Sequence, residues 1–303
     1  MRLCIVGDEK KTKSNIKLVN HAKRLFDAVL YVPYSRICLK EEKKLVITYR
    51  GRNLSRFDII LPRIPKKRSL FAYFLLKSLP LYSPIKPQSF LFWSDRFLQM
   101  HLLRKEGLPT PDLYMVDSAK SASEIIKSGL SFPITMRASS EERGIMFANS
   151  EKEARAMLDT LKTFDTPIYI EDYFDSDYYQ LLVVENRIIT AIKRKPEEKR
   201  DMFFGNGKIY RTTAPSDVKK LAIDSAEAMK TSIASVNIVE KPRKIIGIDL
   251  CPNIETFVPY TKLDIYRELL EFVYESEKSK EKPISKFSNF LRELRSSVND
   301  LFE

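Results

Sequence analysis

Apolar positions in the first third of the chain alternate between strand-like and helix-like spacing. The run Arg2–Val6 predicts a first strand, and apolar residues recur at helical steps through Ser14–Asp27. A second helix, rich in Phe and Leu, is predicted at Ser69–Leu79. Further strands are predicted at Val29–Val32, Ile37–Leu39, Leu45–Tyr49 and Asp58–Leu61. Strands that alternate with helices in this way predict a small parallel sheet.

The middle third, up to Phe174, follows the order helix, helix, strand, loop, strand, helix, strand. Ser94 and Asp95 are capping residues for a helix over Arg96–Glu106, which Gly107 ends. Ser150 precedes Glu153 by three residues, a capping box that opens a further helix with Ala154, Met157, Leu158 and Leu161 on one face. The other predicted elements are a helix at Ser121–Ser128 and strands at Phe132–Arg137, Ile145–Ala148 and Ile168–Glu171.

Two hairpins and two helices are predicted between residues 176 and 275. The second hairpin turns at Lys241–Arg243, and its pairing places Asn237 near Gly247 and Asp249. The predicted strands are Tyr178–Glu185, Ile188–Arg194, Ala234–Glu240 and Lys244–Leu250, and the helices are Pro215–Ser232 and Asp264–Tyr274.

The last part of the chain differs in composition. Glu275–Lys282 is a charged run that predicts a solvated linker ending at Pro283. Beyond it, apolar residues recur at three- and four-residue steps from Phe287 to Phe302, which predicts an amphipathic helix capped by Ser285. Such a helix docks on its own protein, in a partner's groove or, less in keeping with its mixed polar face, on a membrane surface.

Composition excludes several classes of protein. The apolar run Ser69–Tyr82 is broken by Lys77 and Pro80, so no membrane span is predicted. Three cysteines without CxxC spacing indicate a reducing cytoplasm and argue against a disulfide or zinc framework. Gly7 stands alone in its turn, so there is no dinucleotide fingerprint.

The net charge of +12 favours an anionic partner, either RNA or a membrane surface. A proteome of generally basic proteins is the alternative explanation. The high content of Lys, Arg and Glu suggests a thermophilic source, because ion pairs cost less at high temperature.

Four stretches together resemble one family. They are TYRGRNLSRFDIILPRI (Thr48–Ile64), SDRFLQMHLLRKEGLPTP (Ser94–Pro111), the run Phe132–Phe174, and VNIVEKPRKIIGIDLCPNIE (Val236–Glu255). Their order is similar to that of the RimK-type ATP-grasp family, whose members join an amino group to a carboxylate at the expense of ATP. The resemblance implies an α/β fold of three parts with boundaries at 1–93, 94–175 and 176–275, and residues 276–303 lie outside it.

The resemblance also assigns a nucleotide pocket. Arg96 and Arg137 stand where the family has lysines that reach the phosphates, and the loop ending in Gly144 covers those phosphates. The loop gains Glu141 and Glu142, which repel a triphosphate. The hinge that meets the adenine corresponds to Glu171, Asp172, Tyr173 and Phe174. ATP is therefore expected to bind weakly or not at all.

The family's metal and catalytic positions are altered as well. Asn237, Gly247 and Asp249 stand where the family has the Asp, Glu and Asn that hold magnesium, so any magnesium site is weak or absent. Gln180 replaces the arginine that meets the acyl phosphate or the substrate carboxylate. Asn206 matches a catalytic asparagine in the loop Lys195–Lys208, whose mixed basic and aromatic residues also suit RNA.

Two functions remain open on this basis. The first is a degenerate, non-catalytic member that works by binding RNA, a ribonucleoprotein or a protein complex. The second is an active ATP-dependent carboxylate–amine ligase with altered residues. Loss of metal ligands and of the substrate arginine favours the first, because catalysis in this family depends on cations and metals around the phosphates.

Overall fold

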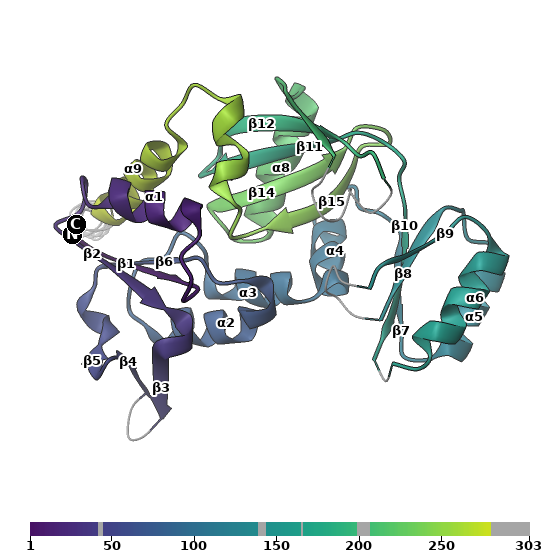
Figure 1. Cartoon of the computed structure of the whole chain (residues 1–303), viewed down its shortest axis with the longest axis horizontal. Helices are drawn as coiled ribbons and strands as arrows, with labels where there is room; N and C mark the ends of the chain where they lie inside the picture. The colour runs from purple at the N-terminus through teal and green to yellow at the C-terminus, as the bar shows by residue number, and fades with distance from the viewer. Residues whose placement is uncertain (42–44, 139–143, 165, 199–206, 280–303) are drawn as a thin grey trace, which may run out of the picture.

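The computed structural model describes residues 1–41, 45–138, 144–164, 166–198 and 207–279. Within them the chain forms three α/β parts, with the N-terminal sheet and the four-stranded sheet at opposite ends of the molecule (Figure 1). The expected three-part α/β architecture is therefore confirmed.

The N-terminal part contains a three-stranded parallel sheet in the order β2-β1-β6. A smaller antiparallel sheet, β3-β4-β5, projects from it, and helices α2 and α3 follow. The elements are β1 (Arg2–Gly7), α1 (Lys13–Ala22), β2 (Ala28–Pro33), β3 (Ile37–Glu41), β4 (Leu45–Tyr49), β5 (Arg52–Asn53), β6 (Ile59–Pro62), α2 (Ser69–Ser78) and α3 (Pro87–Ser94).

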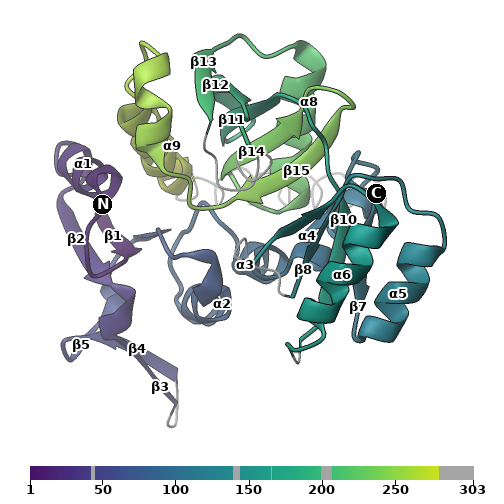
Figure 2. The same cartoon turned by 45° about the vertical axis from the view of Figure 1, so that its right-hand side comes forward.

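The central part packs two helices on one face of a four-stranded antiparallel sheet, β7-β10-β8-β9 (Figure 2). Ser150 Oγ accepts the Glu153 backbone N–H at 3.3 Å, so the predicted cap opens α6. The elements are α4 (Arg96–Lys105), β7 (Leu113–Val116), α5 (Ala119–Lys127), β8 (Ile134–Arg137), β9 (Met146–Ala148), α6 (Glu151–Leu161) and β10 (Ile168–Asp172).

The C-terminal part is a five-stranded antiparallel sheet, β13-β12-β11-β14-β15, with α8 packed against it. The long helix α9 returns to pack on α1 of the N-terminal part. The elements are β11 (Tyr178–Val184), β12 (Arg187–Lys195), β13 (Lys208–Arg211), α8 (Ser216–Ala228), β14 (Ile233–Val239), β15 (Lys244–Asp249) and α9 (Ile265–Lys278).

Several elements differ from the sequence predictions, and strands β7 and β13 were not predicted at all. Helix α1 ends at Ala22 rather than Asp27, because the following N–H groups of Arg24 and Leu25 form tighter three-residue turns. Helix α3 was not predicted, since its run of aromatic residues lacks a polar face. The prediction of a linker from Glu275 was wrong for Glu275–Lys278, which lie in α9.

The predicted C-terminal amphipathic helix, together with the rest of 280–303, lies outside the described residues. Among the residues that are described, no helix is long and apolar enough to cross a bilayer.

Candidate functional site

Helix α4 positions the first predicted phosphate cation. Asp95 caps this helix by accepting the Leu98 backbone N–H at 3.0 Å, and its other carboxylate oxygen accepts the Tyr169 hydroxyl at 2.6 Å. Because Asp95 is held on both sides, Arg96 begins the helix directly over the central sheet. The Arg96 side chain is only 7% exposed.

Strand pairing brings the second cation to the same place. Glu171 of β10 pairs with Thr135 of β8, and Arg137 lies two residues further along β8 on the same face. Arg137 and Glu171 are also buried, with side-chain exposures of 3% and 2%. Three charged side chains from α4, β8 and β10 therefore meet in the interior between the central and C-terminal parts.

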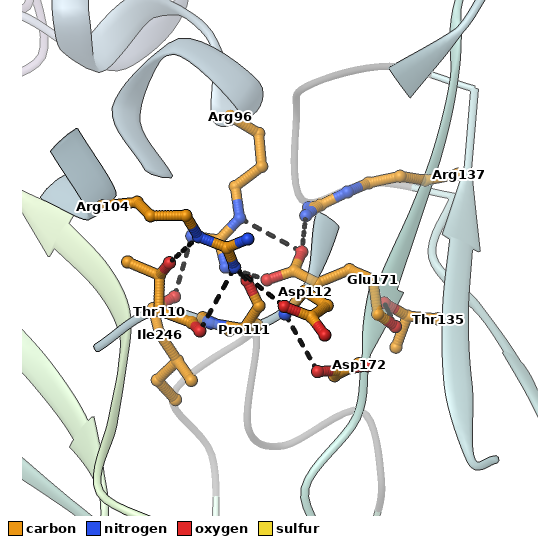
Figure 3. Close-up of polar contacts among 10 residues, drawn as sticks. All are labelled: Arg96, Arg104, Thr110, Pro111, Asp112, Thr135, Arg137, Glu171, Asp172 and Ile246. Carbon is orange, nitrogen blue, oxygen red and sulfur yellow. Dashed lines mark hydrogen bonds and ion pairs between the residues drawn. The ribbon is translucent and has the colours of Figure 1, made fainter. Parts of the chain in front are cut away.

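These residues form a closed ion cluster, drawn in Figure 3, which we call the Arg–Glu–Arg triad (Arg96, Glu171 and Arg137). Arg96 binds Glu171 with two nitrogens, Nη2 to one carboxylate oxygen and Nε to the other at 3.1 Å. Arg137 Nη2 donates to Glu171 Oε2 at 2.7 Å. Arg96 Nη1 also donates to the Ile246 carbonyl at 2.8 Å, which ties the triad to β15.

Opposing effects set the charge of Glu171. Burial by itself raises the pKa of this carboxyl, but the attraction and hydrogen bonds of Arg96 and Arg137 outweigh it and leave the pKa below its ordinary value. Glu171 is therefore ionised at neutral pH, and an anion entering the site must compete with its carboxylate for both guanidinium groups.

Backbone N–H groups of the expected adenine hinge already have hydrogen-bond partners within the protein. The Asp172 N–H donates to the Asp112 carbonyl at 3.1 Å, and Asp172 Oδ2 accepts the Asp112 N–H at 2.9 Å. The Tyr173 N–H donates to the Pro133 carbonyl at 3.1 Å. Arg104 fixes the opposite side of this contact by donating to Asp112 Oδ1 at 3.0 Å (Figure 3). Burial raises the pKa of Asp172.

Aromatic side chains fill the space beside the hinge. Tyr173 packs edge-on against Phe147 with ring centroids 5.3 Å apart, and Phe174 belongs to the same apolar cluster. Tyr178 and Val239 contribute to this cluster from the C-terminal sheet. Gly144 has a φ of +72°, a left-handed conformation that favours glycine, and the rest of its loop, 139–143, lies outside the described residues.

The expected metal hairpin has the predicted register. Gln180, Asn237 and Gly247 are direct neighbours across β11, β14 and β15, and Asp249 pairs with Ser235 two residues further along the strands. Asn237 Oδ1 is buried without a hydrogen-bond partner. Asp249 Oδ1 accepts the Cys251 N–H at 2.9 Å, and burial raises the pKa of Asp249.

The donor set at this hairpin does not fit the magnesium site that the resemblance implies. Magnesium prefers carboxylates among its oxygen ligands, and Asp249 is the one carboxylate among the three positions matched to metal ligands. In the described part of the chain, no group of three or more His, Cys, Asp or Glu residues is placed to hold a metal ion. Asn237 Oδ1 and Asp249 are the oxygens that remain for a weak single ion.

The predicted catalytic residues have different outcomes. Gln180 has both ends of its amide occupied, since Nε2 donates to Ser235 Oγ at 3.1 Å and Oε1 accepts from Arg194 Nε at 2.7 Å. Asn206 lies outside the described residues, as does most of its loop. Sequence reasoning missed the buried Arg194, whose signal is a cation at an inward position of a largely apolar strand.

Comparisons with known proteins agree with this architecture. The RimK-like ATP-grasp domain model matches residues 93–273. A protein named probable alpha-L-glutamate ligase from Serratia proteamaculans is 22% identical over 239 residues, which cover 75% of this chain and 80% of that protein.

Two solved structures share the fold. A RimK domain ATP-grasp protein from Sphaerobacter thermophilus superposes with a TM-score of 0.70 at 14% identity, covering 90% of this chain and 99% of the other. The ATP-grasp ligase PsnB, solved with a precursor variant, Mg and ADP, also gives 0.70 at 12% identity, covering 91% and 98%. Because the family model spans more than half of the sequence, the chain belongs to the RimK-like ATP-grasp family.

Proposed function

We propose that this protein is a non-catalytic member of its family, which acts by binding and not by ATP-dependent ligation. The observation that carries the proposal is the Arg–Glu–Arg triad. The two cations at the phosphate positions already share a buried carboxylate of their own chain. A triphosphate gains little from them unless it displaces Glu171, whose removal from a buried ion pair is costly.

The metal hairpin supports the same proposal. Phosphoryl transfer in this fold relies on cations that neutralise developing charge, and magnesium supplies that charge when it is bound. Here Asn237 and Gly247 bring no carboxylate to the hairpin, while Gln180 brings no positive charge to the acyl-phosphate position. The changes at Asn237 and Gly247 weaken metal binding, and the change at Gln180 removes a positive charge next to the acyl phosphate.

The net charge of +12 suggests what is bound. An anionic macromolecule such as RNA or a ribonucleoprotein fits this charge, because phosphate neutralisation by Lys and Arg provides most of the non-specific affinity. The predicted cytoplasmic location is compatible with such a partner.

An ATP-dependent carboxylate–amine ligase is the second candidate. It is favoured by the glutamate ligase name of the Serratia relative and by the PsnB structure, which was solved with a precursor variant, Mg and ADP. In this alternative, Glu171 releases both arginines when the nucleotide enters.

Measurement of ATP turnover separates the two candidates. The purified full-length chain is incubated with Mg-ATP, with and without a mixture of all amino acids, and released phosphate is measured. We expect no phosphate release above a protein-free control. Arg96 and Arg137 are bound to Glu171 and not to phosphate, and the metal hairpin lacks the carboxylates that hold magnesium. Phosphate release that rises when amino acids are added would establish the ligase instead.

A further inference from the structure

The charge of the chain is unevenly distributed. No Asp or Glu occurs between Asp58 and Asp95, although the whole chain has 40 of them. The same stretch carries six cations, which are Arg63, Lys66, Lys67, Arg68, Lys77 and Lys86. Helix α2 lies in the middle of this acid-free stretch, and in both views no other element is drawn directly below it, although strand β3 to one side reaches further down (Figures 1 and 2).

One face of α2 is apolar and exposed. Its inner face buries Ser69, Ala72, Leu75 and Leu76, as expected for a helix that packs on the protein. On the outer face, Leu70 is 60% exposed and Phe74 is 48% exposed. These two residues are four positions apart, so their side chains are neighbours on the helix surface.

Exposed cations flank the two apolar side chains. Lys77 follows Phe74 by three residues and so lies on the same side of α2, and the exposed Lys67 lies in the 3-10 turn Lys66–Arg68 that leads into the helix. Arg68, at the N-terminal end of α2, is also exposed. We call this surface the α2 ridge (Lys67, Arg68, Leu70, Phe74 and Lys77).

We propose that the α2 ridge docks on the surface of an anionic lipid bilayer. Leu70 and Phe74 insert below the headgroups, while Lys67, Arg68 and Lys77 pair with anionic headgroups around them. Helices that lie in a membrane interface combine these two features, and cationic residues are attracted by the negative surface potential of the lipid. With two partly exposed apolar side chains and three cations, the attachment is reversible.

Two other occupants fit the ridge less well. RNA stacks its bases on flat rings, and of the two exposed apolar side chains only Phe74 is a ring, whereas the more exposed Leu70 provides no such platform. The chain's own segment 284–303 has an apolar stripe, but it carries three basic and three acidic residues, so it offers no net negative charge to the ridge.

Co-sedimentation with lipid vesicles tests the proposal with the full-length chain. Vesicles of phosphatidylcholine alone are compared with vesicles that contain about one third phosphatidylglycerol, an anionic lipid. We expect binding to the anionic vesicles only. Leu70→Ser combined with Phe74→Ser is expected to reduce the bound fraction by about tenfold or more, because both inserting groups are removed.

A matched control is Phe164→Ser, which alters an equally exposed aromatic residue (55%) in the central part and is expected to leave binding unchanged. Melting temperatures of all variants should stay close to that of the parent, since the altered side chains are exposed. The proposal is overturned if the double variant binds as the parent does. It is also overturned if deletion of 284–303 abolishes binding while the ridge is intact, or if the ridge substitutions weaken binding to single-stranded RNA and not to vesicles.

Discussion

Replacing Glu171 by Gln should lower the melting temperature by roughly 6–20 °C. The substitution keeps the size of the side chain but leaves Arg96 and Arg137 buried without their shared counter-charge. Breaking a buried ion pair by removing one partner costs about 3–5 kcal/mol, and each kcal/mol corresponds to about 2–4 °C in a chain of this size. Thermal unfolding followed by circular dichroism measures the change.

A half-exposed ion pair provides the control. Glu151 and Arg155 are paired four residues apart on α6 in the same part of the protein. Glu151→Gln should change stability by less than about 1 kcal/mol, because exposed pairs contribute little. If Glu171→Gln lowers the melting temperature no more than Glu151→Gln does, Glu171 is not a buried counter-charge for Arg96 and Arg137, and the account of the triad is wrong.

The Glu171 variant should also respond to anions. Once the carboxylate is removed, both guanidinium groups are available to a polyphosphate, and binding to the folded state raises its stability. Added pyrophosphate should therefore raise the melting temperature of Glu171→Gln by more than it raises that of the parent.

Restoring two carboxylates at the hairpin should create a divalent metal site. Asn237→Asp and Gly247→Glu act on directly paired residues of β14 and β15. A side chain at Gly247 has room, since its Cβ would lie 3.8 Å from Asn237 Nδ2, an ordinary contact. With Asp249 nearby, the double variant has three carboxylates, and we expect its dissociation constant for Mn²⁺ to improve by at least about tenfold.

Electron paramagnetic resonance of free Mn²⁺ measures this binding directly. Gly247→Gln alone is the matched control, because it adds similar bulk without charge. Adding Asp249→Asn to the double variant should remove most of the gain. No difference between the double variant and the Gln control would mean that these positions do not converge as the register indicates.

The sequence predicted those parts of the fold that depend on interactions between residues close together in the chain. The caps at Asp95 and Ser150 were predicted because a side-chain oxygen before an apolar repeat satisfies free backbone N–H groups. The approach of Asn237 to Gly247 was predicted from a short turn at Lys241–Arg243, but in the structure a β-bulge at Asn237/Ile238 is also needed to place these two residues opposite each other.

The chemistry of the site depends on contacts that no local signal contains. Arg96 and Glu171 are 75 positions apart, and nothing near either residue predicts that they meet. Glu171 was expected to present its backbone to a nucleotide, whereas its side chain neutralises the two cations assigned to the phosphates. At the end of α1 a local signal was present but misleading. Apolar residues recur at helical spacing past Ala22, whereas the helix ends at that residue.

Calorimetric titration of the unmodified full-length chain with Mg-ATP tests the central claim most directly. With both phosphate cations held by Glu171 and one carboxylate at the metal hairpin, we predict a dissociation constant weaker than about 1 mM. A low-micromolar dissociation constant, equivalent to roughly −8 kcal/mol of binding free energy, would show that the nucleotide opens the Arg–Glu–Arg triad and would contradict the account.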